Sequence, residues 1–415
     1  MRKNRYLSAI DLGSSRIRAL IAEPMEGEGE SIRVIGVGEA PSFGMRKGAI
    51  SDGDSLAKSI SEAVEQAETM AGSPIREAAV SISGANVKTQ TGKGVIAVGR
   101  TDGEVTPEDV ERVISSAGKA DVPLNYEIIH IIPRSFRLDD QSDIVDPVGM
   151  QGVRLEVDAL VVLGFLPQIK HTQTILSSCG VSARQFIFAP LAAAESTLDR
   201  QQKELGAAVV DFGGMTTSVA VYEEGELLHC ASFGVGSAHI TNDIAIGLRT
   251  SVELAERVKT EYGTANTRSI DRDEDIRLSM LDPSEDGDVS RYHVGEIIEA
   301  RLEEMFESAE KELKSIDRDY LLPSGVALTG GGACLPEIVD MAKAKLSLPV
   351  SIGYPRSVSG VVDKVDNPAY AVAAGLIFWQ LRRDEVNGGF GGGFSHSGMS
   401  KIFAILKHWF KTFLP

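Results

Sequence analysis

Two short segments, far apart in the chain, each place an aspartate and a turn of small residues after an apolar run. They read Asp11-Leu12-Gly13-Ser14-Ser15 and Asp211-Phe212-Gly213-Gly214-Met215-Thr216-Thr217. Glycine and hydroxyl residues in a turn let backbone N–H groups converge on an anion, and a nearby carboxylate can hold a hydrated cation that neutralises phosphate charge. The pair predicts a cleft that binds nucleotide phosphates, with Mg²⁺ held through water by Asp11 and Asp211. The residues expected to contact phosphate are Gly13, Ser14, Ser15, Gly213, Gly214, Thr216 and Thr217.

Either turn alone is also typical of an ordinary β-hairpin, since each lies between two apolar runs. The recurrence of one pattern in two places favours the nucleotide interpretation. It also predicts two similar halves of the fold that face one cleft.

A third segment is suited to the nucleoside. The apolar run 326–329 leads into Gly330, Gly331 and Gly332. Three consecutive glycines leave no side chain in the way, so a ribose or a purine can lie against the backbone. We expect a helix to begin at Leu335, with Pro336 in its first turn.

Glu256 and Lys259 lie three residues apart on a predicted helix. On one helical face they can reach ribose hydroxyls or the base. The alternative is a solvent-exposed ion pair with no ligand, which is the commoner reason for such spacing.

Taken in chain order, the two Asp-bearing segments and the glycine segment resemble the first phosphate loop, the second phosphate loop and the adenosine loop of the actin-like ATPases. Residues 367–375 resemble the terminal connecting helix of these proteins. Within that superfamily the chain most closely resembles the FtsA family of bacterial division proteins, over residues 6–375 and the C-terminal tail. The resemblance implies an α/β actin-like ATPase fold, with two halves around a nucleotide cleft, an inserted α+β subdomain and a C-terminal amphipathic helix.

The resemblance also implies a function. The family binds ATP and Mg²⁺, self-associates into filaments and holds FtsZ filaments at the cytoplasmic face of the inner membrane, at the division site. Asp211 is the best candidate for a catalytic residue, and turnover should be slow because no dedicated water-activating residue is evident. The family docks the C-terminal peptide of FtsZ on the segment corresponding to residues 296–301, which implicates Arg301, with Lys311 as a neighbour along the helix.

Several elements must position these residues. Apolar periodicity predicts helices over 54–71, 106–117, 168–178, 189–201, 253–262 and 290–316. Strands are predicted over 78–83, 94–99, 127–133, 135–139, 157–164 and 205–212. We assign residues 1–84, 165–208 and 355–386 to the first half, and 209–354 to the second, with a distal subdomain at about 249–325.

Residues 85–164 read as a separate small α+β module. Its place in the chain matches the inserted subdomain of the FtsA family, which takes part in contacts with later division proteins. The alternative is a module that only packs on the core.

The C-terminus suggests a membrane anchor. Residues 387–400 are a flexible Gly/Ser linker, and 401–415 form an amphipathic helix that is too short to span a bilayer. A terminal helix docked on the body is the alternative, although a glycine tether positions a core element poorly. The expected membrane contacts are Lys401, Ile402, Phe403, Ile405, Leu406, Lys407, Trp409, Phe410, Lys411 and Phe413.

Composition limits the remaining possibilities. The chain has 415 residues, 43% of them hydrophobic, and a net charge of −17, which argues against nucleic acid as a partner but allows a large core. No acidic residue follows Glu385, so an anionic membrane attracts the tail and repels the body. The three cysteines are too few and too scattered for a disulfide framework or a Cys-rich metal site, and we expect buried thiols.

Three alternatives share the same ATP-binding pattern. A small-molecule kinase has no use for the tail, and a chaperone of the 70-kDa heat-shock type needs a large domain after residue 375. A pilus-assembly actin homologue is the nearest alternative, and the tail argues against it.

Overall fold

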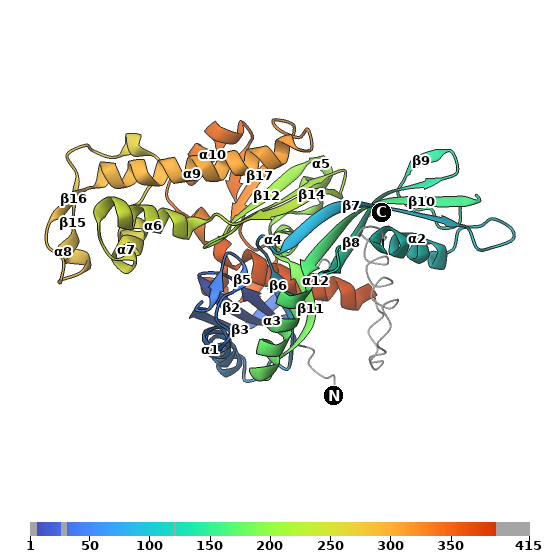
Figure 1. Cartoon of the computed structure of the whole chain (residues 1–415), viewed down its shortest axis with the longest axis horizontal. Coiled ribbons are helices and arrows are strands. Elements are labelled where there is room, and N and C mark those ends of the chain that lie inside the picture. The colour runs from blue at the N-terminus through green and yellow to red at the C-terminus, as the bar shows by residue number, and fades with distance from the viewer. Residues whose placement is uncertain (1–5, 26–30, 120–121, 387–415) are drawn as a thin grey trace.

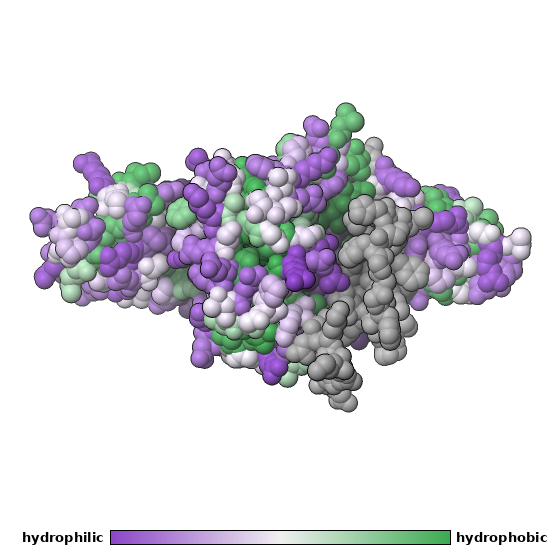
Figure 2. Space-filling view, turned by 90° about the horizontal axis from the view of Figure 1, so that it is seen from below, coloured by the Kyte–Doolittle hydropathy of each residue, from purple (hydrophilic) through white to green (hydrophobic). Residues whose placement is uncertain are grey.

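The computed structural model describes residues 6–25, 31–119 and 122–386. The molecule is elongated, with two sheets at its centre, a helical extension at one end and a separate four-stranded sheet at the other (Figure 1). Seen from below, hydrophilic residues run along the length of the surface and hydrophobic residues form smaller groups between them (Figure 2). None of the helices in the described ranges has the length and the apolar character needed to cross a membrane.

The lower central sheet has the strand order β11-β6-β1-β2-β3-β19, with β1 antiparallel to β2 and parallel to β6. Helix α1 (Gly53–Ala71) approaches β3 closely because two strand residues lack side chains: a Cβ on Gly36 would lie 2.4 Å from Ala67 O, and one on Gly38 would lie 1.8 Å from Ala63 O. The strands are β1 (Leu7–Leu12), β2 (Arg16–Pro24), β3 (Ile32–Pro41), β6 (Glu77–Ile82), β11 (Ser182–Phe188) and β19 (Val358–Gly360), and α3 (Leu166–Ser178) packs beside α1.

The upper central sheet repeats this arrangement. Its order is β14-β13-β12-β17-β18, and β12 runs antiparallel to β13 and parallel to β17. Each Asp-bearing turn therefore joins an antiparallel pair at an equivalent place in its sheet. The strands are β12 (Ala207–Phe212), β13 (Thr217–Glu223), β14 (Glu226–Phe233), β17 (Gly325–Thr329) and β18 (Val350–Ile352).

Two helices of small and apolar residues lie between the sheets and pack against both. These are α4 (Ala189–Thr197) and α12 (Ala371–Val386), which share one buried cluster with residues of β1 and β12. They cross so closely that a Cβ on Gly375 would lie 1.7 Å from Ala192 O. This crossing therefore packs the two halves together between their sheets.

The four-stranded sheet has the order β7-β10-β8-β9 and packs on α2 (Pro107–Lys119). Its strands are β7 (Val87–Ala97), β8 (Tyr126–Leu138), β9 (Gln141–Ile144) and β10 (Arg154–Phe165). Two β8 residues fasten this module to the body. His130 Nε2 accepts a hydrogen bond from Phe188 N–H of β11 at 3.2 Å, and Arg134 donates to the carbonyls of Leu227 and Leu228 on β14. The module thus contacts both central sheets.

The helical extension is built on the long helix α9 (Arg291–Lys314), which begins at the N-cap Ser290. Helix α6 (Ser237–Leu248) packs on α9 and on α7 (Val252–Tyr262). The smaller elements are α8 (Leu278–Leu281), β15 (Asp275–Arg277), β16 (Asp288–Ser290) and η1 (Thr267–Ser269). Elsewhere lie α5 (Arg200–Leu205), α10 (Ile338–Leu346), α11 (Val362–Val365), β4 (Met45–Arg46), β5 (Ala49–Ile50), η2 (Gly331–Cys334) and η3 (Pro368–Tyr370).

Three sequence-based expectations about these elements are wrong. The helix expected over 189–201 breaks at Leu198, which is extended, because Asp199 caps a new helix and accepts a hydrogen bond from Gln202 N–H at 2.7 Å. The two strands expected over 127–133 and 135–139 are one strand, β8.

The third error concerns the helix after the glycines. Pro336 lies outside it, because α10 begins only at Ile338. Glu337 before it is left-handed, with φ of 61°, and its carboxylate accepts hydrogen bonds from Thr264 and Ser269 at 2.8 Å each. These two hydrogen bonds, from the segment that bears Thr264 and Ser269, fix Glu337 in a conformation that does not continue α10 toward Pro336.

Candidate functional site

The two Asp-bearing turns touch each other. A Cβ on Gly214 of the β12–β13 turn would lie 1.9 Å from Ser15 Oγ of the β1–β2 turn. Both turns line a cleft of about 360 Å³, within the roughly 300–1,000 Å³ usual for small-molecule sites. The predicted residues found in the lining are Asp11, Gly13, Ser14, Ser15, Asp211, Gly213, Gly214, Thr216, Glu256, Lys259, Gly330, Gly331 and Gly332.

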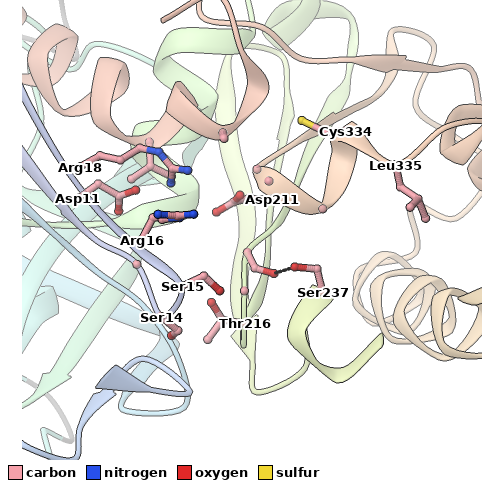
Figure 3. Close-up of a pocket in the computed structure, with 18 of the residues that line it drawn as sticks. Asp11, Ser14, Ser15, Arg16, Arg18, Asp211, Thr216, Ser237, Cys334 and Leu335 are labelled. Atoms are coloured by element: carbon pink, nitrogen blue, oxygen red, sulfur yellow. Dashed lines mark hydrogen bonds between the residues drawn. The ribbon is translucent and has the colours of Figure 1, made fainter. Parts of the chain in front are cut away.

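Thr217 is the one predicted phosphate contact that the structure does not bring to the cleft. Its side chain is fully buried, and its hydroxyl donates to Val235 O at 2.9 Å. The strand alternation explains this, since Thr216 precedes β13 and Thr217 is its first residue. Thr217 therefore secures the strand, and Thr216 alone is available to a ligand (Figure 3).

Asp11 and Asp211 extend into the cleft from opposite halves (Figure 3). Ser81 Oγ donates to Asp11 Oδ1 at 2.8 Å, whereas no described residue donates a hydrogen bond to Asp211. Burial raises the pKa of Asp11 above its ordinary value. Burial, reinforced by the charge of Asp11 and opposed by Arg18, raises the pKa of Asp211 to about 7.

This donor set fits a hydrated Mg²⁺. Two carboxylates in poorly hydrated surroundings repel each other, and a divalent cation between them relieves the repulsion. Mg²⁺ usually keeps several waters and takes one or two carboxylates plus phosphate oxygens. In the described part of the chain, no group of three or more His, Cys, Asp or Glu side chains could hold a metal ion. Water and ligand oxygens would have to complete the coordination shell.

Two basic residues of the cleft were missed at the sequence level. Arg16 and Arg18 follow the first turn on β2 and line the cleft, and in Figure 3 both guanidinium groups lie between Asp11 and Asp211. Glu39 holds Arg18 at 3.0 Å, and the guanidinium lies 5.0 Å from the centre of the Tyr370 ring. The alternation Arg16-Ile17-Arg18 was the available signal, because it places both cations on one side of the strand.

The glycine segment forms the other end of the cleft. A Cβ on Gly331 would meet no atom within 4 Å, so its backbone faces open space. Gly330 and Gly332 are glycine for packing reasons, since their Cβ atoms would lie 2.3 Å from Asp211 Oδ1 and 2.8 Å from Phe212 Cβ. Beyond them the lining includes Ile240, Cys334, Leu335 and Pro336.

The expectation of three buried thiols is wrong at this end of the cleft. Cys334 is exposed, Cys179 is partly exposed and only Cys230 is buried.

Glu256 and Lys259 form the expected ion pair, with Lys259 Nζ 2.6 Å from Glu256 Oε2. The pair is not an exposed surface pair, because only 10% of the Lys259 side chain is accessible and both residues line the cleft. The side chain of Glu256 is about half exposed, at 48%.

The two residues expected to bind a partner lie on α9, outside the cleft lining. Arg301 donates to both carboxylate oxygens of Asp243 on α6, at 2.6 and 3.1 Å, and also to Glu304. These contacts, chiefly the hydrogen bond to Asp243, raise the pKa of Arg301. Lys311 is exposed. The predicted linker 387–400 and tail 401–415 lie outside the described residues.

Comparisons with known proteins agree with one another. A family model described as "Cell division protein FtsA" matches residues 208–375, and one described as "SHS2 domain inserted in FTSA" matches residues 84–163. "Cell division protein FtsA" of Pseudomonas aeruginosa is 32% identical over 92% of this chain and 91% of its own length. The Bacillus subtilis protein of that name is 34% identical over 94% of this chain and 86% of its own length. The Escherichia coli K12 protein is 30% identical, over 90% of each.

Solved structures show similarity in fold at low identity. A "PilM-PilN type IV pilus biogenesis complex" gives a TM-score of 0.65 at 17% identity, covering 91% of this chain and 99% of that one. MreB5 of Spiroplasma citri bound to ADP gives a TM-score of 0.54 at 12% identity, covering 93% of this chain and 99% of that one.

Proposed function

The chain belongs to the FtsA family of cell division proteins and has the actin-like ATPase fold, and from this premise we propose that it is an ATP-binding, polymerising membrane adaptor. In this role it tethers FtsZ filaments to the cytoplasmic membrane at the division site and helps to recruit later division proteins. The single observation that supports this function most is the contact between the two phosphate turns, because it gathers the turns of both halves in one cleft.

Nucleotide binding follows from the chemistry of the cleft. Turns of small residues offer N–H groups to phosphate, Arg16 and Arg18 add two positive charges, and the Gly331 backbone leaves room for the sugar or base. Asp11 and Asp211 would hold Mg²⁺ through water, and the metal would neutralise phosphate charge. A protein of similar fold, MreB5 of Spiroplasma citri, is bound to ADP, which supports nucleotide binding by this chain.

Slow hydrolysis in the same cleft is the enzymatic part of the proposal. Of the two cleft aspartates, Asp211 is the better candidate to orient a water, since Asp11 is already engaged by Ser81. We expect slow turnover, because no dedicated water-activating residue is evident in the sequence.

For FtsZ, the proposed docking surface is the α6–α9 face around Arg301. Ile246 on α6 is 76% exposed, and a Cβ on the adjoining Gly247 would lie 2.6 Å from Ile297 Cδ1 of α9. An apolar contact beside a guanidinium suits an acidic peptide with apolar side chains. Lys311 is proposed as an additional cation further along α9.

Membrane attachment is proposed from the sequence of residues 401–415. Its apolar residues would enter the headgroup boundary, and Lys401, Lys407 and Lys411 would each add about 1 kcal/mol on an anionic surface. Peripheral attachment at the inner membrane is the localisation that this tail supports. The pilus-assembly alternative retains only similarity of fold, at 17% identity.

The test is flotation of the full chain with anionic vesicles, Mg·ATP and a labelled FtsZ C-terminal peptide on a density gradient, where only vesicle-bound protein rises and filaments do not. Protein and peptide should float together, and a chain ending at Ser400 should stay at the bottom while still binding nucleotide. A chain ending at Ser400 that floats as well as the full chain would show that the tail is not the anchor. Peptide left at the bottom while the protein floats would contradict the FtsZ assignment.

A further inference from the structure

One buried hydroxyl connects Glu256 and Lys259, the two cleft residues expected from the sequence to reach the ribose hydroxyls or the base. Thr241 on α6 is 3% exposed and lies outside the cleft lining, behind Lys259. Lys259 Nζ donates to Thr241 Oγ1 at 2.8 Å, and Thr241 in turn donates to Glu256 Oε2. With the Lys259–Glu256 contact of 2.6 Å, the three polar groups close a ring of hydrogen bonds.

The ring fixes the direction of each hydrogen bond. An ammonium group can only donate, so the Thr241 oxygen must accept from Lys259 and its single proton must go elsewhere. The carboxylate of Glu256 takes that proton, because the other acceptor within reach, Ser237 O, is at 3.4 Å and uncharged. Glu256 Oε2 therefore receives two hydrogen bonds from charged or polarised donors.

The second oxygen of Glu256 is left for a ligand. No donor in the described part of the chain reaches Oε1, although the side chain lines the cleft and is about half exposed. The third N–H of the Lys259 ammonium group donates to Ser237 O at 3.4 Å. Glu256, a residue of the cleft lining, thus keeps one carboxylate oxygen with no donor from the described residues, and sugar hydroxyls require an acceptor of this kind.

We infer that Thr241 is a positioning residue that aims Glu256 at the ribose hydroxyls and so gives the cleft its preference for ribose over a sugar without hydroxyls. The inference rests on the proposed nucleotide binding and on the assignment of Glu256 to the ribose. Without the Thr241 hydroxyl, the carboxylate of this half-exposed side chain would be held by one lysine alone and could rotate into solvent. A ligand that hydrogen-bonds through its hydroxyl groups would then have to order the Glu256 carboxylate on binding, and this ordering lowers the affinity for the ligand.

The experiment compares ATP with 2′,3′-dideoxyATP on the full chain by calorimetry with Mg²⁺. The wild-type protein should bind ATP about tenfold more tightly, as expected for one or two hydrogen bonds to a charged acceptor. Thr241→Val, of similar shape, should bring this ratio close to one by weakening ATP alone, and Thr241→Ser should keep it. Because both ligands are measured on the same preparation, a partly unfolded variant does not change the ratio. Thr241→Ala removes the same hydroxyl if Thr241→Val does not fold.

The possible outcomes distinguish failure of the Thr241 inference from failure of the proposed nucleotide binding. A wild-type ratio that persists in both Thr241→Val and Thr241→Ala overturns the positioning role. Equal wild-type affinity for the two nucleotides overturns the ribose assignment and this inference with it, but leaves nucleotide binding intact. A wild-type protein that binds neither nucleotide overturns the proposed function as well.

Discussion

Asp243 and Arg301 form a two-point ion pair between α6 and α9, with Nε 2.6 Å from Oδ2 and Nη2 3.1 Å from Oδ1. The residue proposed to bind an acidic peptide is therefore already paired with a carboxylate of its own chain. Any peptide carboxylate that binds Arg301 must share the guanidinium with Asp243 or displace it. If the proposed peptide binds here, Asp243 competes with it for Arg301.

Removing the competing charge should strengthen peptide binding. We expect Asp243→Asn to bind an FtsZ C-terminal peptide severalfold more tightly, and Arg301→Glu to bind it poorly through like-charge repulsion, with nucleotide affinity unchanged in both. Fluorescence anisotropy with a labelled peptide measures this. Asp158→Asn is the matched control, because it makes the same change in an ion pair of the four-stranded module, where Asp158 lies 3.4 Å from Lys93. Weaker binding by Asp243→Asn would show that Asp243 positions Arg301 instead of competing for it.

The metal assignment predicts an effect that depends on Mg²⁺. Asp211→Asn should weaken Mg·ATP binding, because one of the two carboxylates is lost. In the presence of EDTA the same variant should bind ATP as well as the wild type or better, since it removes a negative charge from the phosphate site. Titration calorimetry under both conditions distinguishes the two effects. An equal loss of affinity with and without Mg²⁺ would mean that Asp211 acts on the nucleotide without the metal.

His130 predicts a specific acid sensitivity. Burial lowers the pKa of His130 to about 3, against 6.5 for an accessible histidine, so the unfolded chain binds the extra proton more readily. The stabilisation is complete above pH 6.5 and is lost as the pH falls toward 3. Near pH 5 the loss should be about 2 kcal/mol.

Urea denaturation at pH 7.5 and pH 5 checks this. His130→Gln keeps an acceptor for Phe188 N–H without titrating in this range, and its stability should fall less on acidification. The same acid response in variant and wild type would assign the effect to other groups.

The crossing of α4 and α12 should tolerate no added methyl group. Gly375→Ala would place its Cβ 1.7 Å from Ala192 O, so the helices must separate, and we expect a loss of about 1–3 kcal/mol or more in the free energy of unfolding. Gly331→Ala is the control, since its Cβ meets nothing within 4 Å. Chemical denaturation of both variants gives the comparison. Equal stability of the two would show that the helices can part without cost.

The family, the fold and most of the cleft were predictable because they depend on local patterns. An aspartate before a turn of small residues is visible in sequence, and its recurrence predicted the repeated hairpins that β1–β2 and β12–β13 form. The FtsA resemblance is confirmed by relatives of 30–34% identity.

What the sequence could not predict depends on contacts between distant segments. Thr241 has no local signal, since its role exists only when α7 lies against α6. Pro336 fits a helical first turn by its residue type, and only the loop bearing Thr264 and Ser269 keeps it outside α10. The pairing of Arg301 with Asp243 likewise joins two helices whose approach no spacing rule encodes.

The first turn of α6 has a further electrical consequence. Ser237 N–H donates to Gly213 O at 3.0 Å, and Ala238 N–H donates to Gly214 O at 2.7 Å. Each of these carbonyls shares a peptide plane with the N–H of the next residue in the turn, and a hydrogen bond to one end of a peptide group polarises the other end. The N–H groups at the positive end of the α6 dipole therefore polarise the peptide groups of the second turn. This polarisation makes the N–H of Gly214 a stronger hydrogen-bond donor than an isolated loop amide. Any tilt of α6 that lengthens these two hydrogen bonds would weaken the turn's hold on an anion without moving a side chain of the cleft.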